Sequence, residues 1–550
     1  MIINLLKNNF WILLILIIGF ALRIINITSV PPSLNWDETS IGYNAYSILK
    51  TGRDEWGEFM PVHFKSFGEY KLPAQIYASI PAIAIFGLNE FGVRITPVVY
   101  GTLTVLLLYF LVQELFRKKE ISLISAFFLA VSPWHIQLTR GSFESSFSLF
   151  WFVLGALFLV KGLQKPKWII ASMVPFVISV YTYNTARVFT PMFLFVFYLI
   201  NAKYLIKNLK YALLGFLTFV ILALPIVPFV LSGDASARYK LVSITDDKGL
   251  IPRIEERRNL SKLPPVVTKL IHNRYTYNTF YFAQNYIAHF TPDFLFINGA
   301  GHRQHHVQGV GELYWIQAPF LLYGLYLLIK RKDWSLKVLL PWLFLSFVPV
   351  SMTNDSIPNA LRTLIAVPVY QILTAVGLLA IWEMTKSRGQ KTSLLIIVVI
   401  LFLINFGIYL NNYFIKYPIN YSRDWQYGNK QVVEYIKNNQ DRYDLIVFTR
   451  HYGEPHIFTL FNLKYDPAKY QNSSNLERFE TFDWVRVLRF DKYYFPDLGD
   501  EGTMYGDIVT HYADKKILFI GKSGDFPANA KILERINFLD GTEAFEITTN

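Results

Sequence analysis

Long apolar stretches separated by short polar segments run along the chain as far as residue 415. A stretch of about 18 or more apolar residues can cross the ~30 Å hydrocarbon core of a bilayer as a helix, because a helix satisfies its own backbone hydrogen bonds. The pattern predicts a mainly α-helical, polytopic membrane protein with about eleven transmembrane helices. The expected spans are residues 9–29, 91–115, 121–138, 143–162, 168–184, 188–201, 211–231, 313–329, 336–352, 361–384 and 392–414.

Basic residues follow every second expected span. They are Arg117, Lys118 and Lys119; Lys161, Lys165 and Lys167; Lys203, Lys207 and Lys210; Lys330, Arg331, Lys332 and Lys337; and Lys386, Arg388 and Lys391. Short basic loops stay in the cytoplasm, so we expect a cytoplasmic N-terminus and an extracytoplasmic C-terminus. This assignment of the loops to the two sides of the membrane requires that the apolar stretch 72–86 does not span the bilayer. Because it contains Gln75 and Ser79, we expect it to be a helix lying in the interface.

The polar segments divide the chain into two expected domains. Residues 1–415 form a transmembrane domain with long external loops at 30–90 and 232–312, and residues 416–550 form a soluble extracytoplasmic domain. In this tail, residues 443–448 and 516–520 read as strands and residues 431–438 as a helix, which predicts a small α/β fold.

Composition narrows the classes of function. The formal net charge is +13, which the basic cytoplasmic loops explain without a nucleic-acid partner. The chain contains no cysteine, which excludes disulfides and thiolate chemistry. The first apolar segment lacks an Ala-x-Ala cleavage pattern, so we expect it to remain as a span.

The acidic pair Asp37–Glu38 stands directly after the first span. The residues that follow have helical spacing as far as Gly52, so Asp37 could simply cap a helix. Adjacent acids at a membrane surface also suit a general base that takes a proton from a hydroxyl, or a divalent metal site.

Further polar motifs lie on the same, extracytoplasmic side. They are Glu69, Tyr70 and Lys71; Arg140 and Glu144; Tyr183 and Arg187; His302 and Arg303; and Asn359 and Arg362. Each has a simpler explanation: Lys71 can extend to lipid headgroups, Arg140 and Glu144 can pair locally, the histidines can lie in a solvated loop, and an isolated Arg can anchor the interface.

Their shared side is the stronger observation. Several Arg and Lys residues on one membrane face, together with a carboxylate pair, suit a phosphate carried on a lipid, because Arg forks bind phosphate oxygens. No Walker loop, Rossmann fingerprint or nucleophile elbow is visible in the sequence.

The motifs resemble those of glycosyltransferase family 39, which includes the protein O-mannosyltransferases and the lipid A aminoarabinose transferases. The resemblance rests on the acidic pair after the first span, on Glu69-x-Lys71-x-Pro73 and on Phe91-Gly92-Val93-Arg94. Segments 140–144, 181–187 and 359–362 also look like those of bacterial members. It covers roughly residues 1–415, and the tail does not match the characterised branches.

The resemblance implies a GT-C fold and a sugar donor carried on a polyprenyl phosphate. It also implies that Asp37 is the catalytic acid of the family, with Glu38 beside it, and that Lys71 matches an essential lysine of the aminoarabinose transferases. In those enzymes the lysine directly precedes proline, whereas Leu72 intervenes here.

We therefore hypothesise an inverting hexosyl- or pentosyltransferase of the cell membrane. Asp37 would activate an acceptor hydroxyl of a lipid, glycan or protein. Lys71, Arg140, Arg187 and Arg362 would hold the donor phosphate, and Glu69, Tyr70, Glu144, Tyr183, His302 and Arg303 are candidates for substrate binding. No cofactor is required, although a divalent metal could take part. The alternatives are a transporter or lipid flippase and a polymerase or ligase of surface polysaccharide.

Overall fold

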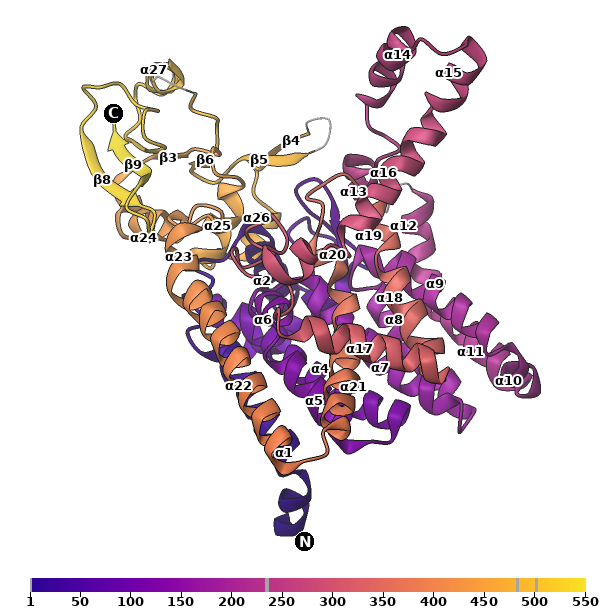
Figure 1. Cartoon of the computed structure of the whole chain (residues 1–550). Helices are drawn as coiled ribbons and strands as arrows, with labels where there is room; N and C mark the ends of the chain where they lie inside the picture. The colour runs from indigo at the N-terminus through magenta and orange to yellow at the C-terminus, as the bar shows by residue number, and fades with distance from the viewer. Residues whose placement is uncertain (1, 233–236, 481–483, 500–502) are drawn as a thin grey trace. The chain divides into compact units, whose positions relative to one another are not determined.

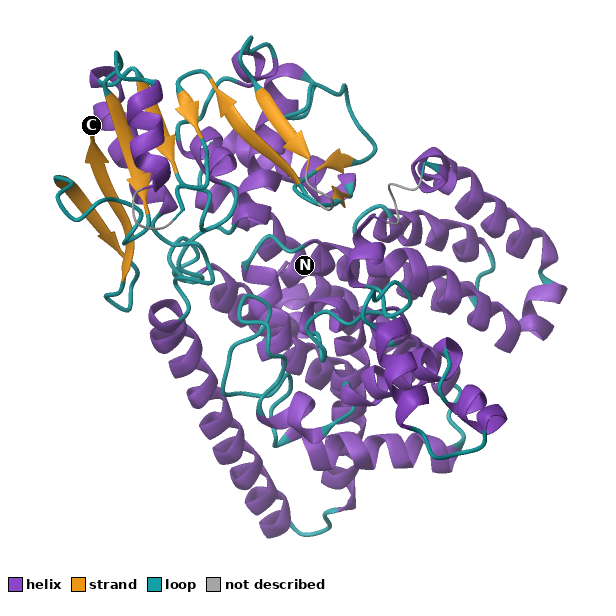
Figure 2. Ribbon diagram, turned by 90° about the horizontal axis from the view of Figure 1, so that it is seen from above, coloured by secondary structure: helices purple, strands orange, loops and turns teal. Residues whose placement is uncertain are grey.

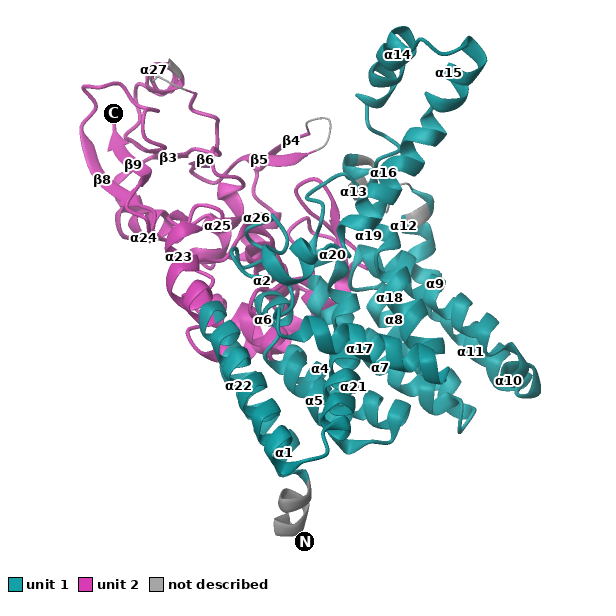
Figure 3. Ribbon diagram, in the orientation of Figure 1, with its two compact units in different colours: residues 1–23, 99–139, 144–409 teal, residues 24–98, 140–143, 410–550 magenta. Residues whose placement is uncertain are grey.

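The computed structural model describes residues 2–232, 237–480, 484–499 and 503–550. The chain forms two compact units that interleave along the sequence (Figure 3). Unit 1 comprises residues 1–23, 99–139 and 144–409, and unit 2 comprises residues 24–98, 140–143 and 410–550. Residues 30–90 therefore belong to the same unit as the C-terminal tail. The successive domains 1–415 and 416–550 stay a prediction, and the compact units follow a different division.

Unit 1 is helical (Figure 1). Its helices, some of which run on into unit 2, are α1 (Ile2–Ile24), α4 (Glu90–Phe116), α5 (Lys119–Ala130), α6 (Pro133–Arg140), α7 (Glu144–Gly162), α8 (Lys167–Val180), α9 (Asn184–Ile200), α10 (Ala202–Lys207), α11 (Leu209–Ala223), α12 (Val227–Leu231), α13 (Ala237–Val242), α14 (Leu250–Leu260), α15 (Pro265–Ile271), α16 (Arg274–Ala288), α17 (Gln317–Arg331), α18 (Leu336–Ser346), α19 (Val348–Ser351), α20 (Ala360–Thr363), α21 (Val367–Met384) and α22 (Arg388–Asn411).

Every expected span falls on helical structure, which confirms the mainly α-helical prediction. Among the described residues, five helices are long and apolar enough to cross a membrane, or six if the bent pair α5–α6 forms one span. These two helices meet at an angle of 54°. Several other predicted spans are shorter apolar helices, so a membrane protein with several spans is supported but the count of eleven is not confirmed.

Glycine allows two helices of unit 1 to approach closely. A Cβ atom on Gly324 of α17 would lie 2.0 Å from the carbonyl oxygen of Leu373, and one on Gly377 of α21 would lie 1.8 Å from that of Phe320. Small residues at such crossings bring backbones together where apolar lipid gives no hydrophobic drive for helix association. The pair α17–α21 is therefore packed in the manner of a membrane bundle.

Unit 2 combines helices with a seven-stranded sheet, seen from above in Figure 2. Its elements are α2 (Trp36–Thr51), β1 (Phe64–Lys65), β2 (Tyr70–Lys71), α3 (Pro73–Phe86), α23 (Tyr417–Asn420), α24 (Asn429–Asn439), β3 (Leu445–Phe448), α25 (Pro455–Asn462), α26 (Pro467–Gln471), β4 (Glu477–Glu480), β5 (Val485–Phe490), β6 (Tyr493–Tyr494), α27 (Thr503–His511), β7 (Ile517–Gly521), β8 (Ile532–Asn537) and β9 (Glu543–Thr549).

The strand order is β4-β5-β6-β3-β7-β9-β8. Strand β3 is parallel to β6 and β7, and the other neighbouring strands are antiparallel. Strands β3 and β7 and helix α24 lie where the sequence predicted them, so the α/β fold of the tail is confirmed. A separate hairpin pairs β1 with β2.

The core of unit 2 joins segment 30–90 to the tail. Ile41 and Tyr43 of α2 are fully buried in one cluster with Phe461 of α25. The Tyr43 hydroxyl donates to the carbonyl oxygen of Tyr465 at 3.1 Å. Helix α2, which carries the acidic pair, is thus fixed by residues more than 400 positions later in the chain.

Candidate active site

The start of α2 sets the positions of the acidic pair. The Asn35 side chain accepts a hydrogen bond from the backbone N–H of Glu38 at 2.9 Å, and the Glu38 carboxylate accepts one from the Asn35 N–H at 3.3 Å. This reciprocal arrangement is a capping box. Because Asn35 is the cap, the interpretation of Asp37 as a cap is wrong. Gly52 ends the helix in the left-handed conformation, as predicted.

Asp37 forms an ion pair with Lys71. The Lys71 Nζ donates to Asp37 Oδ1 at 2.5 Å, and the lysine side chain is 2% exposed whereas that of Asp37 is 37% exposed. A charge as buried as Lys71 needs a partner, and removal of that partner is costly. Lys71 is therefore enclosed in the protein and does not extend to solvent. It holds one oxygen of a carboxylate whose side chain is itself partly exposed.

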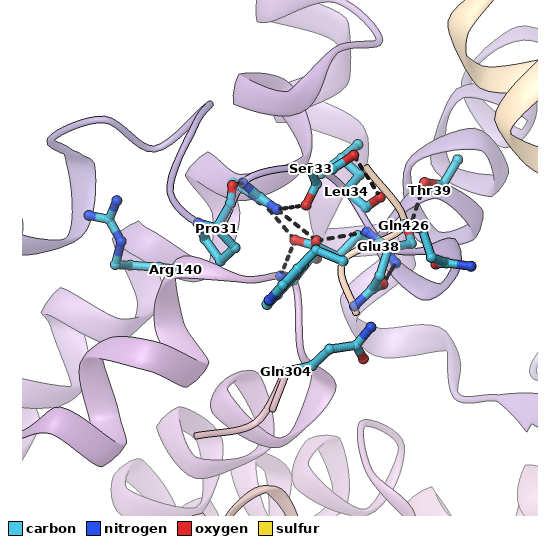
Figure 4. Close-up of polar contacts among 12 residues, drawn as sticks. Pro31, Ser33, Leu34, Glu38, Thr39, Arg140, Gln304 and Gln426 are labelled. Atoms are coloured by element: carbon cyan, nitrogen blue, oxygen red, sulfur yellow. Dashed lines mark hydrogen bonds and ion pairs between the residues drawn. The ribbon is translucent and has the colours of Figure 1, made fainter. Parts of the chain in front are cut away.

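Glu38 has the opposite surroundings. Its two oxygens accept from Arg94 Nε and Nη2, each at 2.9 Å, and both side chains are fully buried. Figure 4 shows Glu38 among its polar contacts. The Ser142 N–H also donates to Glu38 Oε1 at 2.9 Å. Together with the cap, these bonds occupy both oxygens. The geometry favours a positioning role for Glu38, and its predicted part in catalysis stays a prediction.

Two buried arginines fix the segment that leads into α2. Arg94 donates to the carbonyl oxygens of Ile27, Pro31 and Ser33 at 3.0, 2.8 and 2.5 Å. Arg140 donates through Nη2 to the carbonyl oxygens of Ile25 and Val30 at 2.7 and 2.6 Å. Through these bonds, Arg140 holds the backbone between Ile25 and Val30 in place. They do not support the prediction that it binds phosphate, which stays untested.

The hairpin β1–β2 carries the other predicted residues of this motif. Tyr70 lies edge-on to His63 with ring centroids 5.3 Å apart, and the Glu69 carbonyl oxygen accepts from the Ser66 N–H. Gln75 of α3 donates to the Ser142 hydroxyl at 2.7 Å. The hairpin, α3 and segment 140–143 therefore support one another around the Asp37–Lys71 pair.

In unit 1, Arg187 lies in the first turn of α9. Its guanidinium stands 5.0 Å from the centre of the Phe229 ring, and its Nε and Nη2 atoms are buried without a hydrogen-bond partner among the described residues. Pro191, Leu194 and Tyr198 follow on the same helical face. They line an apolar cavity of about 320 Å³ with residues of α8 and α11.

Arg362, also in unit 1, has a protein partner for its fork. It donates to Asp355 Oδ2 at 2.6 Å and to the Thr353 hydroxyl at 2.8 Å. Asn359 caps the short helix α20 by accepting from the Arg362 N–H. The arginine thus anchors the loop before α20. Its predicted contact with a donor phosphate stays a prediction.

The histidine segment is a packed loop. The rings of His302 and His305 stack with centroids 3.7 Å apart. His306 donates from Nδ1 to Glu312 at 2.9 Å and from Nε2 to the Val310 carbonyl oxygen at 2.7 Å, which requires the doubly protonated ring. Burial opposes this charge, but Glu312 raises the pKa of His306 overall. His306 is therefore a structural cation.

The remaining predicted residues are dispersed. Glu144 begins α7, Tyr183 directly precedes α9, and Arg303 is exposed. Within the described ranges, no group of three or more His, Asp or Glu side chains has the arrangement of a metal site. A divalent metal stays a prediction.

The comparison with protein families gives one match. The profile of the dolichyl-phosphate-mannose-protein mannosyltransferase family matches residues 76–229. Among solved structures, ArnT from Cupriavidus metallidurans has a TM-score of 0.56 at 9% identity, covering 99% of this chain and 98% of that one. The fold is that of the GT-C glycosyltransferases. The resemblance predicted from the motifs is thereby confirmed.

Two oligosaccharyltransferases are also similar to this chain. The enzyme of Archaeoglobus fulgidus, tethered to an acceptor peptide, has a TM-score of 0.52 at 15% identity, covering 98% of this chain and 74% of that one. The dolichyl-phosphooligosaccharide-protein glycotransferase 2 of Pyrococcus horikoshii is 24% identical over 235 residues, which are 38% of this chain and 29% of the relative. The match spans less than a third of that relative.

Sequence reasoning missed the partner of Glu38. Arg94 was noted only as part of a motif, although a charged residue five positions into an apolar helix is costly unless it is paired. That cost was the available signal. The partner itself lies 56 positions away, which no local pattern reveals.

Proposed function

We propose that this protein is an inverting membrane glycosyltransferase. It transfers a hexosyl or pentosyl group from a polyprenyl phosphate to an acceptor hydroxyl on the extracytoplasmic face. The observation that carries this proposal is the Asp37 carboxylate, which is partly exposed and held at one oxygen by the buried Lys71. Such a group is oriented and yet accessible, as a general base must be.

The reaction is a single displacement. The open oxygen of Asp37 takes the proton of the acceptor hydroxyl. The acceptor oxygen then forms a bond to the anomeric carbon, while the bond from that carbon to the phosphate oxygen breaks and the polyprenyl phosphate leaves with the electron pair. Attack opposite to the leaving group inverts the anomeric configuration, as in inverting glycosidases with the acceptor in place of water.

The donor site is assigned to the residues around Arg187. Its buried, unpartnered nitrogens suit the oxygens of a phosphate, and the apolar cavity on the same face of α9 suits an isoprenoid chain. A solved structure of ArnT, with a TM-score of 0.53 and 11% identity, contains undecaprenyl phosphate. Because the forks of Arg140 and Arg362 hold protein oxygens, Arg187 is the best-supported phosphate ligand of the three.

The experiment tests Asp37 with the full chain in detergent. Asp37→Asn should lower transfer from a polyprenyl-phosphate sugar by roughly a hundred- to ten-thousand-fold while donor binding persists. Asp507→Asn is the matched control, because this residue is exposed on α27 of the same unit. Near-normal transfer by Asp37→Asn would remove the residue from the mechanism.

A double variant separates chemistry from stability. Asp37→Asn leaves Lys71 buried without its counter-charge, which could lower the melting temperature. Asp37→Asn combined with Lys71→Met removes both charges and should recover the melting temperature without recovering transfer. Recovery of both would mean that the ion pair is purely structural.

A further inference from the structure

Three aromatic rings from separate parts of unit 2 meet, and two of them come from the segments that carry the Asp37–Lys71 pair. Trp36 directly precedes Asp37, Phe67 lies in the hairpin that carries Lys71, and Trp484 directly precedes β5 of the C-terminal sheet. The Trp36 and Trp484 rings are 5.9 Å apart and 63° from parallel. Those of Phe67 and Trp484 are 6.4 Å apart and 17° from parallel. We call these three rings the aromatic corner.

The tail holds the corner in place. The Trp484 indole N–H donates to Glu454 Oε1 at 2.5 Å, and the Val485 N–H donates to the Phe67 carbonyl oxygen at 2.5 Å. Glu454 is buried, so the orientation of the Trp484 ring is fixed from behind.

Trp36 is fixed in the same way. Its backbone N–H donates to Gln426 Oε1 at 2.8 Å, and Gln426 donates to the Tyr452 carbonyl oxygen at 2.7 Å. A Cβ atom on Gly453 would lie 2.3 Å from the Trp36 ring, so only glycine allows the tail to lie under it. Residues 426, 452 and 453 therefore hold Trp36, the residue before Asp37, in place.

Two of the three rings in the corner are partly exposed in the part of the chain that the structure describes. Phe67 is buried, whereas Trp36 and Trp484 are only partly buried. Trp36, which directly precedes Asp37 in the chain, and Trp484 thus offer two partly exposed indole rings, inclined at 63° to each other, for a ligand to contact. The C–H groups on one face of a sugar ring carry partial positive charge and contact the electron-rich face of such a ring.

We propose that the aromatic corner binds the sugar ring of a carbohydrate acceptor and presents its hydroxyl to Asp37. This deepens the proposed function and rests on it for the role of Asp37. The tail is then the part of the enzyme that selects the acceptor. A peptide acceptor is the competing class, and the experiment below separates the two.

The test uses saturation-transfer NMR on the full chain in detergent. The probes are the methyl glycosides of glucose, galactose, mannose and N-acetylglucosamine, and the capped peptide Ala-Ser-Thr-Ala. We expect saturation of the ring C–H protons of at least one glycoside. Trp484→Ala should weaken that binding roughly ten-fold, the equivalent of one lost aromatic contact.

Trp56→Ala is the matched control. Trp56 is also partly buried in unit 2, and its indole N–H also makes one hydrogen bond, to the Lys65 carbonyl oxygen at 3.0 Å. This variant should retain glycoside binding. Trp484→Phe, which keeps the ring but not the bond to Glu454, should fall between wild type and Trp484→Ala.

A donor arm identifies which sugar the corner binds. Binding of polyprenyl-phosphate mannose and polyprenyl-phosphate glucose should be the same in wild type and Trp484→Ala. Equal weakening of donor binding would assign the corner to the donor sugar and overturn the proposal. Glycoside signals that are absent in wild type or unchanged in Trp484→Ala, or a signal from the peptide alone, would also overturn it.

The binding measurement needs no turnover. The role of Asp37 as general base and the binding of sugar by the aromatic corner can therefore be refuted independently of each other. Normal transfer by Asp37→Asn would refute the base and leave Trp484-dependent glycoside binding as a fact. If transfer is lost in Asp37→Asn but unaffected in Trp484→Ala, the proposed glycosyltransferase activity stands and the proposed role of the aromatic corner is refuted.

Discussion

At the scale of the residue, the neighbouring acids Asp37 and Glu38 differ in their solvent exposure and in their ion-pair partners. Asp37 shares one oxygen with Lys71 and is partly exposed, whereas Glu38 is fully buried against Arg94. Burial and partners, not residue type, therefore separate a group that can exchange a proton with substrate from one that holds a helix start in place.

Glu38→Gln should damage the fold more than the chemistry. Loss of one partner from a buried ion pair leaves Arg94 uncompensated, at a cost of roughly 3–5 kcal/mol. Glu480→Gln is the matched control, since Glu480 pairs with Lys65 at the surface and is 67% exposed. Its loss should cost less than about 1 kcal/mol. Melting temperatures decide the point, and equal melts for the two variants would contradict it.

Glu55 should make stability depend on pH. Burial raises the pKa of Glu55 to about 7, although His456 and Arg478 act in the other direction. The folded chain therefore binds more protons than the unfolded chain between the ordinary pKa of 4.5 and about 7. The contribution of Glu55 to the free energy of unfolding is therefore fully present at low pH. It decreases by on the order of 3 kcal/mol as the pH rises through that window.

Glu55→Gln removes this titration. The melting temperature of the variant, taken relative to wild type, should be higher at pH 8 than at pH 5, because glutamine stays neutral at both. Parallel pH profiles for the two proteins would show that Glu55 does not titrate in this window.

At the scale of the element, the positions of helices and strands can be predicted from the sequence more fully than the contacts that these elements make with one another. Helix α2 ends at Gly52 as predicted, because a left-handed C-cap is a local property. Asn35 and Asp37 are both good caps, but the local sequence favours Asn35, because Glu38 three residues later completes a capping box. Asp37 pairs instead with Lys71.

Helix α2 should tolerate no side chain at Gly42. A Cβ there would lie 2.6 Å from Val93 and 2.7 Å from Phe461, so Gly42→Ala should cost about 1–3 kcal/mol through overpacking. Because α2 carries Asp37, transfer should fall as well. Gly506→Ala on α27 is the control, as nothing lies within 4 Å of its added Cβ. Similar melts and similar transfer rates in both variants would contradict the prediction.

At the scale of the whole molecule, the sequence predicted two successive domains, whereas the compact units interleave. The tail was read as a separate fold because its strands are recognisable on their own. What joins it to segment 30–90 is a shared apolar core and hydrogen bonds such as that of Gln471 to the Asp54 carbonyl oxygen, 417 positions apart. Contacts of that range leave no periodic signal.

The basic loops predict the membrane topology, and this topology determines on which side of the membrane Asp37 lies. Reporter fusions at Lys119, Lys332 and Lys391 should be active only with a cytoplasmic reporter such as green fluorescent protein, since each lies in a short basic segment at a helix end. A fusion at Asn550 should be active only with an extracytoplasmic reporter such as alkaline phosphatase. Paired fusions of both reporters at each site control for expression. Because α2, its hairpin and the tail form one unit, an external Asn550 places Asp37 on the same side of the membrane. A cytoplasmic Asn550 would move the Asp37–Lys71 pair to the inner face and contradict transfer at the outer one.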